Sequence, residues 1–358
     1  MSEVLYVGCW EIGKLVHLCH KFLNHNSNNL VISKKYCLWG EIMTLVTMMR
    51  FDENSLMAMA DEQTSTSIGK SNVRTKINLV YDHDKRKIIM GNTGKSYVNI
   101  AFTQSVENKL KNRGMSIDKA LYEAREFFVD FRTQKLEEFM KVKFPGVNLQ
   151  SLYTGKVNKE PFSREIFNMV KTVLDGTETS MKSILGGSVL FGSYDPNIGT
   201  QVHYLKYRDC ELSPIGMIPG VIGSGSLVAN NILRKYLSSK PKNERENLDH
   251  TEAAITMLHS YNGACESARG VGGFPTIYYL NEGEMTVVDD NCAYLAAKIA
   301  GNDLRDTKEI FKKAADPAAW IDSLLFQDNS LNPVLENMAS LAKDQTKYHR
   351  WAFGLKKY

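Results

Sequence analysis

The sequence lacks several features that would point to a membrane, to secretion or to nucleic acid. It has no run of eighteen apolar residues, the approximate length of a membrane-spanning helix. Its first residues, MSEVLYVGCWEIGKLVHLCH, lack the charged start, long apolar stretch and small-residue cleavage site of a secretory signal. The formal net charge is only +4, without a long lysine and arginine block, so we expect no binding to nucleic acid or to an anionic membrane. These absences favour a cytoplasmic protein.

The sequence also lacks paired cysteines. Its six cysteines are scattered, and no CxxC spacing occurs among them. Cys9, Cys19, His20 and Cys37 lie near enough in sequence for a metal site to be conceivable. Reduced, buried thiols are the usual state of scattered cysteines in an intracellular chain. We therefore expect core cysteines here rather than a metal site.

What is present is the composition of an ordinary globular protein. Hydrophobic residues make up 43% and charged residues 23% of the 358 residues, enough for one large domain or two smaller ones. Apolar runs and alternation predict strands, and apolar residues at helical spacing predict helices. Strand-like segments lie at 44–51, 55–60, 76–82, 85–92, 186–195, 201–215 and 276–290. Helix-like segments lie at 96–114, 116–144, 163–176, 223–239 and 250–267.

The order of these segments predicts the fold class. Strands come first, then helices, strands, helices and strands, with a helical and polar region after about residue 290. The first four strands are expected to pair as two antiparallel hairpins. Ser116 is expected to cap the long helix that follows it. The prediction is an α+β fold in which two antiparallel sheets lie between outer helices, a four-layer αββα sandwich.

The stretch TGKS at 93–96 invites a nucleotide-binding interpretation. A P-loop requires a first glycine five positions before the second, and counting back from Gly94 gives Ile89. The preceding strands are also expected to pair as hairpins rather than as parallel crossovers. We therefore reject the nucleotide site and interpret this stretch as a strand-to-helix turn.

Six short motifs occur in an order that is similar to one known family. They are TLVTMMRF from Thr44, MAD ending at Asp61, KINLV from Lys76, GNTGKS around Gly94, IGSGSLVAN at 222–230 and VGGFPTIYYL at 271–280. Together they resemble the proteasome β-subunit and HslV-like family of N-terminal-nucleophile (Ntn) hydrolases, over roughly residues 44–288. The resemblance implies a threonine peptidase.

The resemblance also implies a role for each matching residue. Thr44 would be the nucleophile, Lys76 its charged partner and Asp61 the carboxylate that orients the lysine. Ser224 would form hydrogen bonds near the amine of Thr44, and the backbone N–H of Gly94 would face the oxyanion. A threonine hydroxyl needs a base, and a free α-amine with a pKa of roughly 7.7–8.0 can serve as one. This chemistry requires no metal or organic cofactor.

Further expectations follow from the family alone. Substrate-lining positions would be Thr64, Ser65, Asn92 and Ser96. The substrate would be a peptide or an unfolded protein, the assembly a homo-oligomeric ring, and an unfoldase ATPase a partner by family analogy only. The domains would be an N-terminal extension or propeptide at 1–43, an Ntn domain at 44–290 with a helical insert at about 116–180, and a helical C-terminal extension at 291–358.

Each assigned residue also has a plainer interpretation. Thr44 suits a strand by propensity alone, and Asp61 fits a turn. Lys76 fits a charge at a strand edge, and Ser224 fits a helix N-cap. These alternatives stay open at the level of sequence.

Some positions depart from the family pattern. Met43 precedes Thr44, so the amine is exposed only if this bond is cut or if translation begins at Met43. Gln63 stands where proteasome subunits carry arginine, as it does in HslV-type peptidases, and Lys95 adds a bulky charge after Gly94. Glu266 is displaced from the position of the family aspartate. The alternative function is a catalytically inactive structural or assembly subunit that retains residues 1–43.

Overall fold

The computed structural model describes most of the chain after residue 43. The described residues are 44–62, 64–66, 69–71, 76–94, 96–111, 113–144, 146–148, 151, 154–157, 160–161, 163–174, 186–208, 210–268, 270–301, 316–327, 330–342 and 348. All of them belong to one unit, Gly40–Tyr358. The predicted extension at 1–43 lies outside the described residues, and so do the four residues of the conceivable metal site, Cys9, Cys19, His20 and Cys37.

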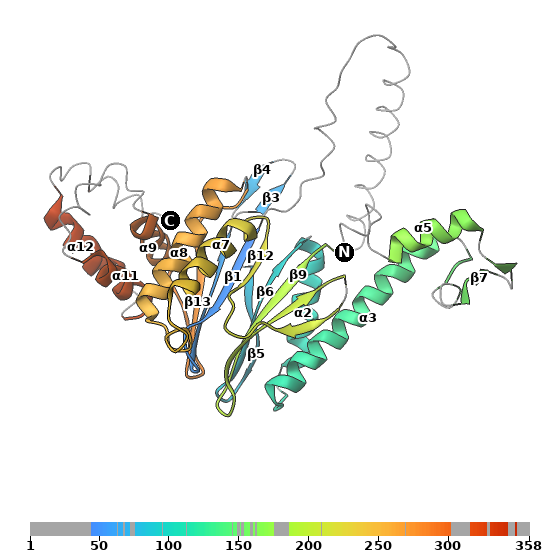
Figure 1. The fold of residues 1–358 in the computed structure, drawn as a ribbon, viewed down its shortest axis with the longest axis horizontal. Coiled ribbons are helices and arrows are strands. Elements are labelled where there is room, and N and C mark those ends of the chain that lie inside the picture. Colours follow the sequence, from blue (N-terminus) through green and yellow to red (C-terminus); the bar gives the residue numbers. More distant parts are fainter. Residues whose placement is uncertain are drawn as a thin grey trace, which may run out of the picture. The chain divides into compact units, whose positions relative to one another are not determined.

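Two antiparallel sheets of five strands form the centre of the fold (Figure 1). The first sheet has the order β12 (Gly220–Gly223), β1 (Leu45–Arg50), β2 (Ser55–Asp61), β13 (Pro275–Asn281) and β14 (Glu284–Val287). The second has the order β11 (Leu212–Pro214), β10 (Gly199–Lys206), β9 (Ser188–Asp195), β6 (Arg86–Thr93) and β5 (Ile77–His83). The predicted α+β fold with two antiparallel sheets is confirmed.

The two predicted N-terminal hairpins form, but they belong to different sheets. β1 pairs with β2 in the first sheet, and β5 pairs with β6 in the second. The predicted strand segment 201–215 covers most of β10 and all of β11, whereas the edge strand β12 and four short strands were not predicted. The four short strands are β3 (Thr64–Thr66), β4 (Gly69–Ser71), β7 (Lys156–Val157) and β8 (Glu160–Pro161). Each is too short to show a strand-like apolar pattern.

Helices form where helical spacing predicted them. The described helices are α2 (Ser96–Leu110), α3 (Ile117–Lys143), α5 (Arg164–Leu174), α7 (Ser226–Ser239), α8 (His250–Ser267), α9 (Asp290–Gly301), α11 (Pro317–Leu325) and α12 (Leu331–Leu341). Ser116 caps α3 as predicted, because its side chain accepts a hydrogen bond from the backbone N–H of Lys119. Among the described residues, no helix has both the length and the apolar character that crossing a membrane requires.

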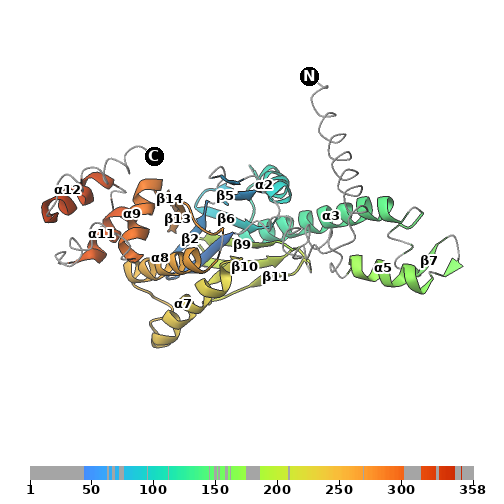
Figure 2. The same ribbon diagram turned by 90° about the horizontal axis from the view of Figure 1, so that it is seen from above.

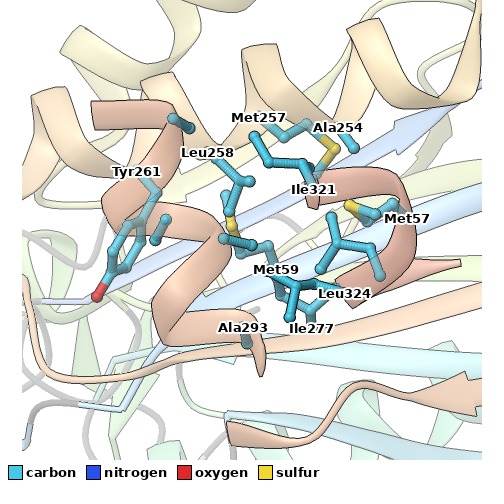
Figure 3. Close-up of a cluster of buried hydrophobic side chains, with 14 of the residues drawn as sticks. Met57, Met59, Ala254, Met257, Leu258, Tyr261, Ile277, Ala293, Ile321 and Leu324 are labelled. Atoms are coloured by element: carbon cyan, nitrogen blue, oxygen red, sulfur yellow. The ribbon is translucent and has the colours of Figure 1, made fainter. Parts of the chain in front are cut away.

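Three clusters of buried apolar side chains hold the sheets and helices together. Figures 1 and 2 show the sheets and helices that these clusters join. The first joins the first sheet to α7, α8, α9, α11 and α12, and Figure 3 shows Met57 and Met59 of β2 packed against Met257, Ile321 and Leu324. The second joins the second sheet to α2 and α3. The third contains side chains from both sheets.

Strand β1 divides its side chains between these clusters. Leu45 and Met49 join the helix-facing cluster, whereas Val46 and Met48 join the cluster shared by both sheets. Successive side chains of a strand point to opposite faces. Thr44, which directly precedes β1, therefore continues the face of Val46 and Met48 that is turned towards the second sheet.

The predicted insert at about 116–180 has a small core of its own. The C-terminal part of α3 packs against α5 through Leu136, Met140, Val147, Val170 and Val173. Figure 2 shows α3 continuing away from the strands to reach α5. The first part of α3 thus packs on the second sheet, and the rest of the insert forms a helical arm with a core of its own.

Candidate functional site

Strand pairing fixes the position of Thr44. The next residue, Leu45, is paired with Gly223 of β12, and Val46 is paired with Ala60 of β2. Thr44 is only 2% exposed. Gly223 has φ +103°, and a Cβ placed on it would lie 1.9 Å from the carbonyl oxygen of Thr44. A glycine is therefore required here, because the backbone at Gly223 lies directly against Thr44.

Ser224 binds the backbone of Thr44. The Thr44 N–H donates to Ser224 Oγ over 3.1 Å, and the Ser224 hydroxyl in turn lies 3.4 Å from the carbonyl oxygen of Thr44. The N-cap of α7 is Gly225, and no side chain caps this helix. The interpretation of Ser224 as a helix N-cap is therefore wrong, and its hydroxyl instead binds the backbone nitrogen of Thr44.

Asp61 and Lys76 form a buried ion pair that links the two sheets. Lys76 Nζ lies 2.7 Å from Asp61 Oδ1, and the exposed fractions of the two side chains are 9% and 0%. Asp61 is the last residue of β2, and Lys76 directly precedes β5. The alternative of a turn aspartate is therefore wrong. Lys76 does lie beside the edge strand β5, but its ammonium is buried against Asp61.

Two backbone groups also hold the Asp61 carboxylate. The N–H of Leu45 donates to Oδ1 over 2.7 Å, and the N–H of Gly272 donates to Oδ2 over 3.4 Å. Charge-assisted hydrogen bonds of this kind fix a carboxylate strongly. Asp61 thus connects the residue next to Thr44 directly with the lysine ammonium.

Burial shifts both members of the pair towards their neutral forms. Burial raises the pKa of the Asp61 carboxyl, while the Lys76 ammonium and the backbone N–H groups oppose the shift. Burial lowers the pKa of Lys76, and the Asp61 charge opposes that shift. Perturbed pKa values with a specific charge partner are typical of functional sites.

The sequence interpretation missed a second carboxylate, Glu62. Its Oε1 accepts a hydrogen bond of 3.1 Å from the Thr276 hydroxyl. Burial raises the pKa of Glu62, and Asp61 and Lys76 are among the charges that act on it. The only signal in the sequence was its place directly after Asp61.

The glycine-rich loop before β13 was also missed as part of the site. Gly272 and Gly273 both have positive φ, +154° and +88°. The Tyr261 hydroxyl on α8 donates to the carbonyl oxygen of Gly273 over 2.7 Å. The loop was matched to a strand entry by resemblance, but that match gave no sign that its backbone holds Asp61.

Gly94 occupies the strand-to-helix turn that the sequence predicted. β6 ends at Thr93 and α2 begins at Ser96. Gly94 has φ +117°, and a Cβ placed on it would lie 2.9 Å from the Cα of Gly187. The described contacts of Gly94 are with Gly187 and Asn99, not with Thr44, Asp61, Lys76 or Ser224. Its role as an oxyanion donor stays a prediction.

The predicted substrate-lining residues are only partly described. Asn92 is 5% exposed, and its side-chain amide donates to the Thr103 hydroxyl of α2 over 3.0 Å. Thr64 and Ser65 lie in β3, and Ser96 begins α2, while the side chains of all three lie outside the description. Gln63 and Lys95 fall outside it as well.

The structure thus gathers Thr44, Asp61, Lys76 and Ser224 at one end of the first sheet. Within the described ranges, no group of three or more histidine, cysteine, aspartate or glutamate side chains is arranged to hold a metal ion. No protein-family model and no curated protein matches this sequence.

Proposed function

We propose that this chain is a proteasome-like threonine peptidase or amidohydrolase, with Thr44 as its nucleophile once the amine of Thr44 is exposed. The observation that carries the proposal is the buried pair of Asp61 and Lys76. Its carboxylate also binds the N–H of Leu45, next to a threonine whose own nitrogen is bound by Ser224. The four residues that the resemblance selected thus form two adjacent hydrogen-bonded groups, Thr44 with Ser224 and Asp61 with Lys76, which the neighbouring residues Thr44 and Leu45 connect along the chain.

The arrangement of the apolar clusters supports the same family. Helices contact the outer face of the first sheet, side chains of both sheets share a cluster, and further helices contact the second sheet. We propose that these elements form the four-layer αββα sandwich of the Ntn hydrolases. In that arrangement the nucleophile precedes a strand that faces the other sheet, as Thr44 precedes β1.

The proposed reaction uses the freed amine as the base. The Thr44 hydroxyl loses its proton to the α-amine while its oxygen attacks the substrate carbonyl. The tetrahedral intermediate collapses, the C–N bond breaks, and the amine returns the proton to the leaving nitrogen. Water then hydrolyses the ester by the same proton route and restores the threonine. The Lys76 ammonium, held by Asp61, stabilises the negative charge that develops on the threonine oxygen.

The remaining parts of the proposal come from the family resemblance. The backbone N–H of Gly94 would stabilise the oxyanion. Thr64, Ser65, Asn92 and Ser96 would line the site for a peptide or unfolded protein. A homo-oligomeric ring would enclose the site, and an ATPase unfoldase would feed it.

One observation favours the second candidate, an inactive structural or assembly subunit. In the uncut chain the nitrogen of Thr44 is a peptide amide that donates to Ser224, and Thr44 is 2% exposed. A peptide amide cannot act as a base. If residues 1–43 were retained, the hydrogen bonds and ion pair around Thr44 and Asp61 would therefore serve only the structure.

Intact-mass measurement with N-terminal sequencing distinguishes the two candidates. We expect a species that begins at Thr44 and reacts covalently with a peptide vinyl sulfone. Thr44→Ala should abolish both the processing and the labelling. Thr47→Ala is the matched control, because it removes another buried threonine hydroxyl from β1, the strand that Thr44 precedes, and that hydroxyl bonds to the carbonyl oxygen of Met59. A single species that begins at Met1 would exclude the Thr44 mechanism.

A further inference from the structure

We propose that Asn99 and Tyr207 are positioning residues that fix the backbone of the Gly94 turn. The proposal rests on the proposed function in one respect, that this turn serves the reaction at Thr44. Neither residue belongs to the motifs that identified the site. Asn99 lies in α2, and Tyr207 directly follows β10, 108 positions further along the chain.

The Gly94 turn needs support from outside because its conformation is unusual. Its φ of +117° lies in the region that favours glycine, which is also the most flexible residue. One peptide group is held by close packing, since a Cβ on Gly187 would lie 2.4 Å from the carbonyl oxygen of Thr93. The orientation of the following peptide group then depends on the carbonyl of Gly94.

Asn99 binds that carbonyl. Its Nδ2 lies 3.4 Å from the carbonyl oxygen of Gly94 and donates to it. An asparagine amide can bind in either of two orientations, and its other partner decides between them. The carbonyl oxygen of Gly94 can only accept, so Nδ2 faces it, and Asn99 Oδ1 then accepts from the Tyr207 hydroxyl over 2.9 Å.

These two hydrogen bonds form a relay from the Tyr207 hydroxyl through Asn99 to the Gly94 carbonyl, and Tyr207 is its rigid support. It is 0% exposed, stacks on Phe128 with ring centroids 4.3 Å apart, and meets Phe102 edge to face. Its backbone N–H donates to the carbonyl oxygen of Gly187, the residue packed against the turn. Burial raises the pKa of the Tyr207 hydroxyl, which therefore stays protonated and available as a donor.

The Gly94 N–H belongs to the peptide group that Gly187 packs against, and the relay holds the peptide group that follows through the Gly94 carbonyl, so the backbone is fixed on both sides of Gly94. This matters because an oxyanion donor works only if it is positioned before the reaction begins. Reorienting a backbone N–H during the reaction would remove most of its benefit. Supporting hydrogen bonds that lock the reacting groups are therefore as important as the groups themselves. Tyr207 and Asn99 supply this support from the packed core of the second sheet.

The test compares two variants with a matched control. Tyr207→Phe removes only the hydroxyl, and Asn99→Asp keeps the acceptor for Tyr207 but replaces the donor to Gly94. The control is Tyr81→Phe, which removes another buried hydroxyl of the same cluster, one that binds the backbone at Arg113 and Met115. The measurements are hydrogen–deuterium exchange of peptides covering residues 88–99, and kcat and KM on a tripeptide aminomethylcoumarin amide.

We expect faster exchange in the turn for both variants and not for the control. We also expect kcat to fall about tenfold in Tyr207→Phe and about a hundredfold in Asn99→Asp, with KM changed less than about twofold. The double variant should be no worse than Asn99→Asp, because both act through one contact. Unchanged exchange in both variants would overturn the proposal. Faster exchange together with an inactive wild type would retain the positioning role and overturn only the proposed function.

Discussion

The β1–β2 hairpin has a carboxylate at each end, and the two ends stabilise it differently. At the turn, burial opposes the charge of Asp52, but hydrogen bonds from His250, Asn54 and Ser55 lower its pKa. At the open end, burial dominates and raises the pKa of Asp61, although Lys76 is only 2.7 Å away. The exposed fractions of the two side chains, 20% for Asp52 and 0% for Asp61, account for the difference.

The hydrogen bonds around the two ends of the β1–β2 hairpin also differ. At the turn end, the N–H of Thr200 donates to the carbonyl oxygen of Glu53, and the N–H of Glu282 donates to that of Asn54. Backbone hydrogen bonds thus join the β1–β2 turn to the turns of the β9–β10 and β13–β14 hairpins. At the open end, the N–H of Glu62 donates to the carbonyl oxygen of Phe274, and the N–H groups of Leu45 and Gly272 donate to the buried Asp61 carboxylate. The turn end is stabilised by neighbouring hairpins, whereas the open end holds a buried charged pair whose burial costs free energy, as expected of a functional site.

The largest effect should come from breaking the buried pair. Lys76→Met leaves the Asp61 carboxylate buried without its partner, which should cost about 3–5 kcal/mol of unfolding free energy. The matched change at the turn end, His250→Gln, leaves Asp52 partly exposed and should cost less, about 1–2 kcal/mol. Urea unfolding of both variants measures the difference.

A double variant tests whether the unfolding free energy lost in Lys76→Met comes from the interaction between Lys76 and Asp61. Lys76→Met combined with Asp61→Asn should recover part of the lost stability, because no buried charge is left unpaired. It should still fail to react with the peptide vinyl sulfone. Simple addition of the two single losses would show that the residues do not act as a pair.

The next prediction compares two glycine-to-alanine variants that should lose similar stability but differ in their reactivity towards the vinyl sulfone. Gly223 and Gly199 both have positive φ, +103° and +85°. A Cβ would lie 1.9 Å from the Thr44 carbonyl oxygen in the first case and 2.5 Å from that of Glu53 in the second. Each glycine-to-alanine variant should lose about 3 kcal/mol.

Only Gly223→Ala should also slow vinyl sulfone labelling, because only this change displaces Thr44. Because both variants should lose a similar free energy of unfolding, a difference between their labelling rates can be assigned to the displacement of Thr44. Equal loss of labelling in Gly199→Ala would show that reactivity follows global stability, and the distinction between the two ends would then fail.

The carboxylates should also give opposite pH dependences of stability. The lowered pKa of Asp52 means that its contribution is present above the ordinary value of 3.8 and is lost as the pH falls through the folded value. The raised pKa of Asp61 means that its contribution is present below 3.8 and is lost as the pH rises through the folded value.

Urea unfolding between about pH 3 and about pH 6 measures this difference, with slopes of at most about 1.4 kcal/mol per pH unit. As the pH is lowered, the free energy lost in Asp52→Asn should shrink and that lost in Asp61→Asn should grow. Parallel profiles for the two variants would contradict the assignment.

The sequence predicted much of the open end because its signals are local. Apolar runs marked β1, β2, β5 and β6, and short motifs marked Thr44, Asp61, Lys76 and Ser224. These features depend on neighbouring residues, and a hairpin brings its own strands together. Only the resemblance predicted that these residues lie close together, and the structure gives the hydrogen bonds between Thr44 and Ser224 and between Leu45 and Asp61, which pairs with Lys76.

The features that were missed depend on contacts between distant residues. β12 contains Gly220 and Gly223, which disfavour a strand, and it forms because β1 pairs with it. The hydrogen bond between Asp52 and His250 joins positions 198 apart, and the one between Asn99 and Tyr207 joins positions 108 apart. No local pattern reveals such partners, because packing of the whole fold selects them.

The smallest effect concerns how two neighbouring helices begin. At the turn end, Asp249 caps α8 by accepting a hydrogen bond from the N–H of Glu252 over 2.8 Å. At the open end, Gly225 is the N-cap of α7 and no side chain caps this helix, while Ser224 binds Thr44 instead. Asp249→Ala should therefore cost about 1 kcal/mol, whereas Ser224→Ala should change stability by less than about 0.5 kcal/mol.

Reactivity should show the reverse order. Ser224→Ala removes the hydroxyl that holds the nitrogen of Thr44, so vinyl sulfone labelling should slow by about tenfold or more, whereas Asp249→Ala should label at the wild-type rate. Thermal unfolding and labelling of the same two preparations provide the comparison. If Ser224→Ala lost as much stability as Asp249→Ala and kept its labelling rate, Ser224 would be a structural residue. The open end would then differ from the turn end only in how deeply its carboxylate is buried.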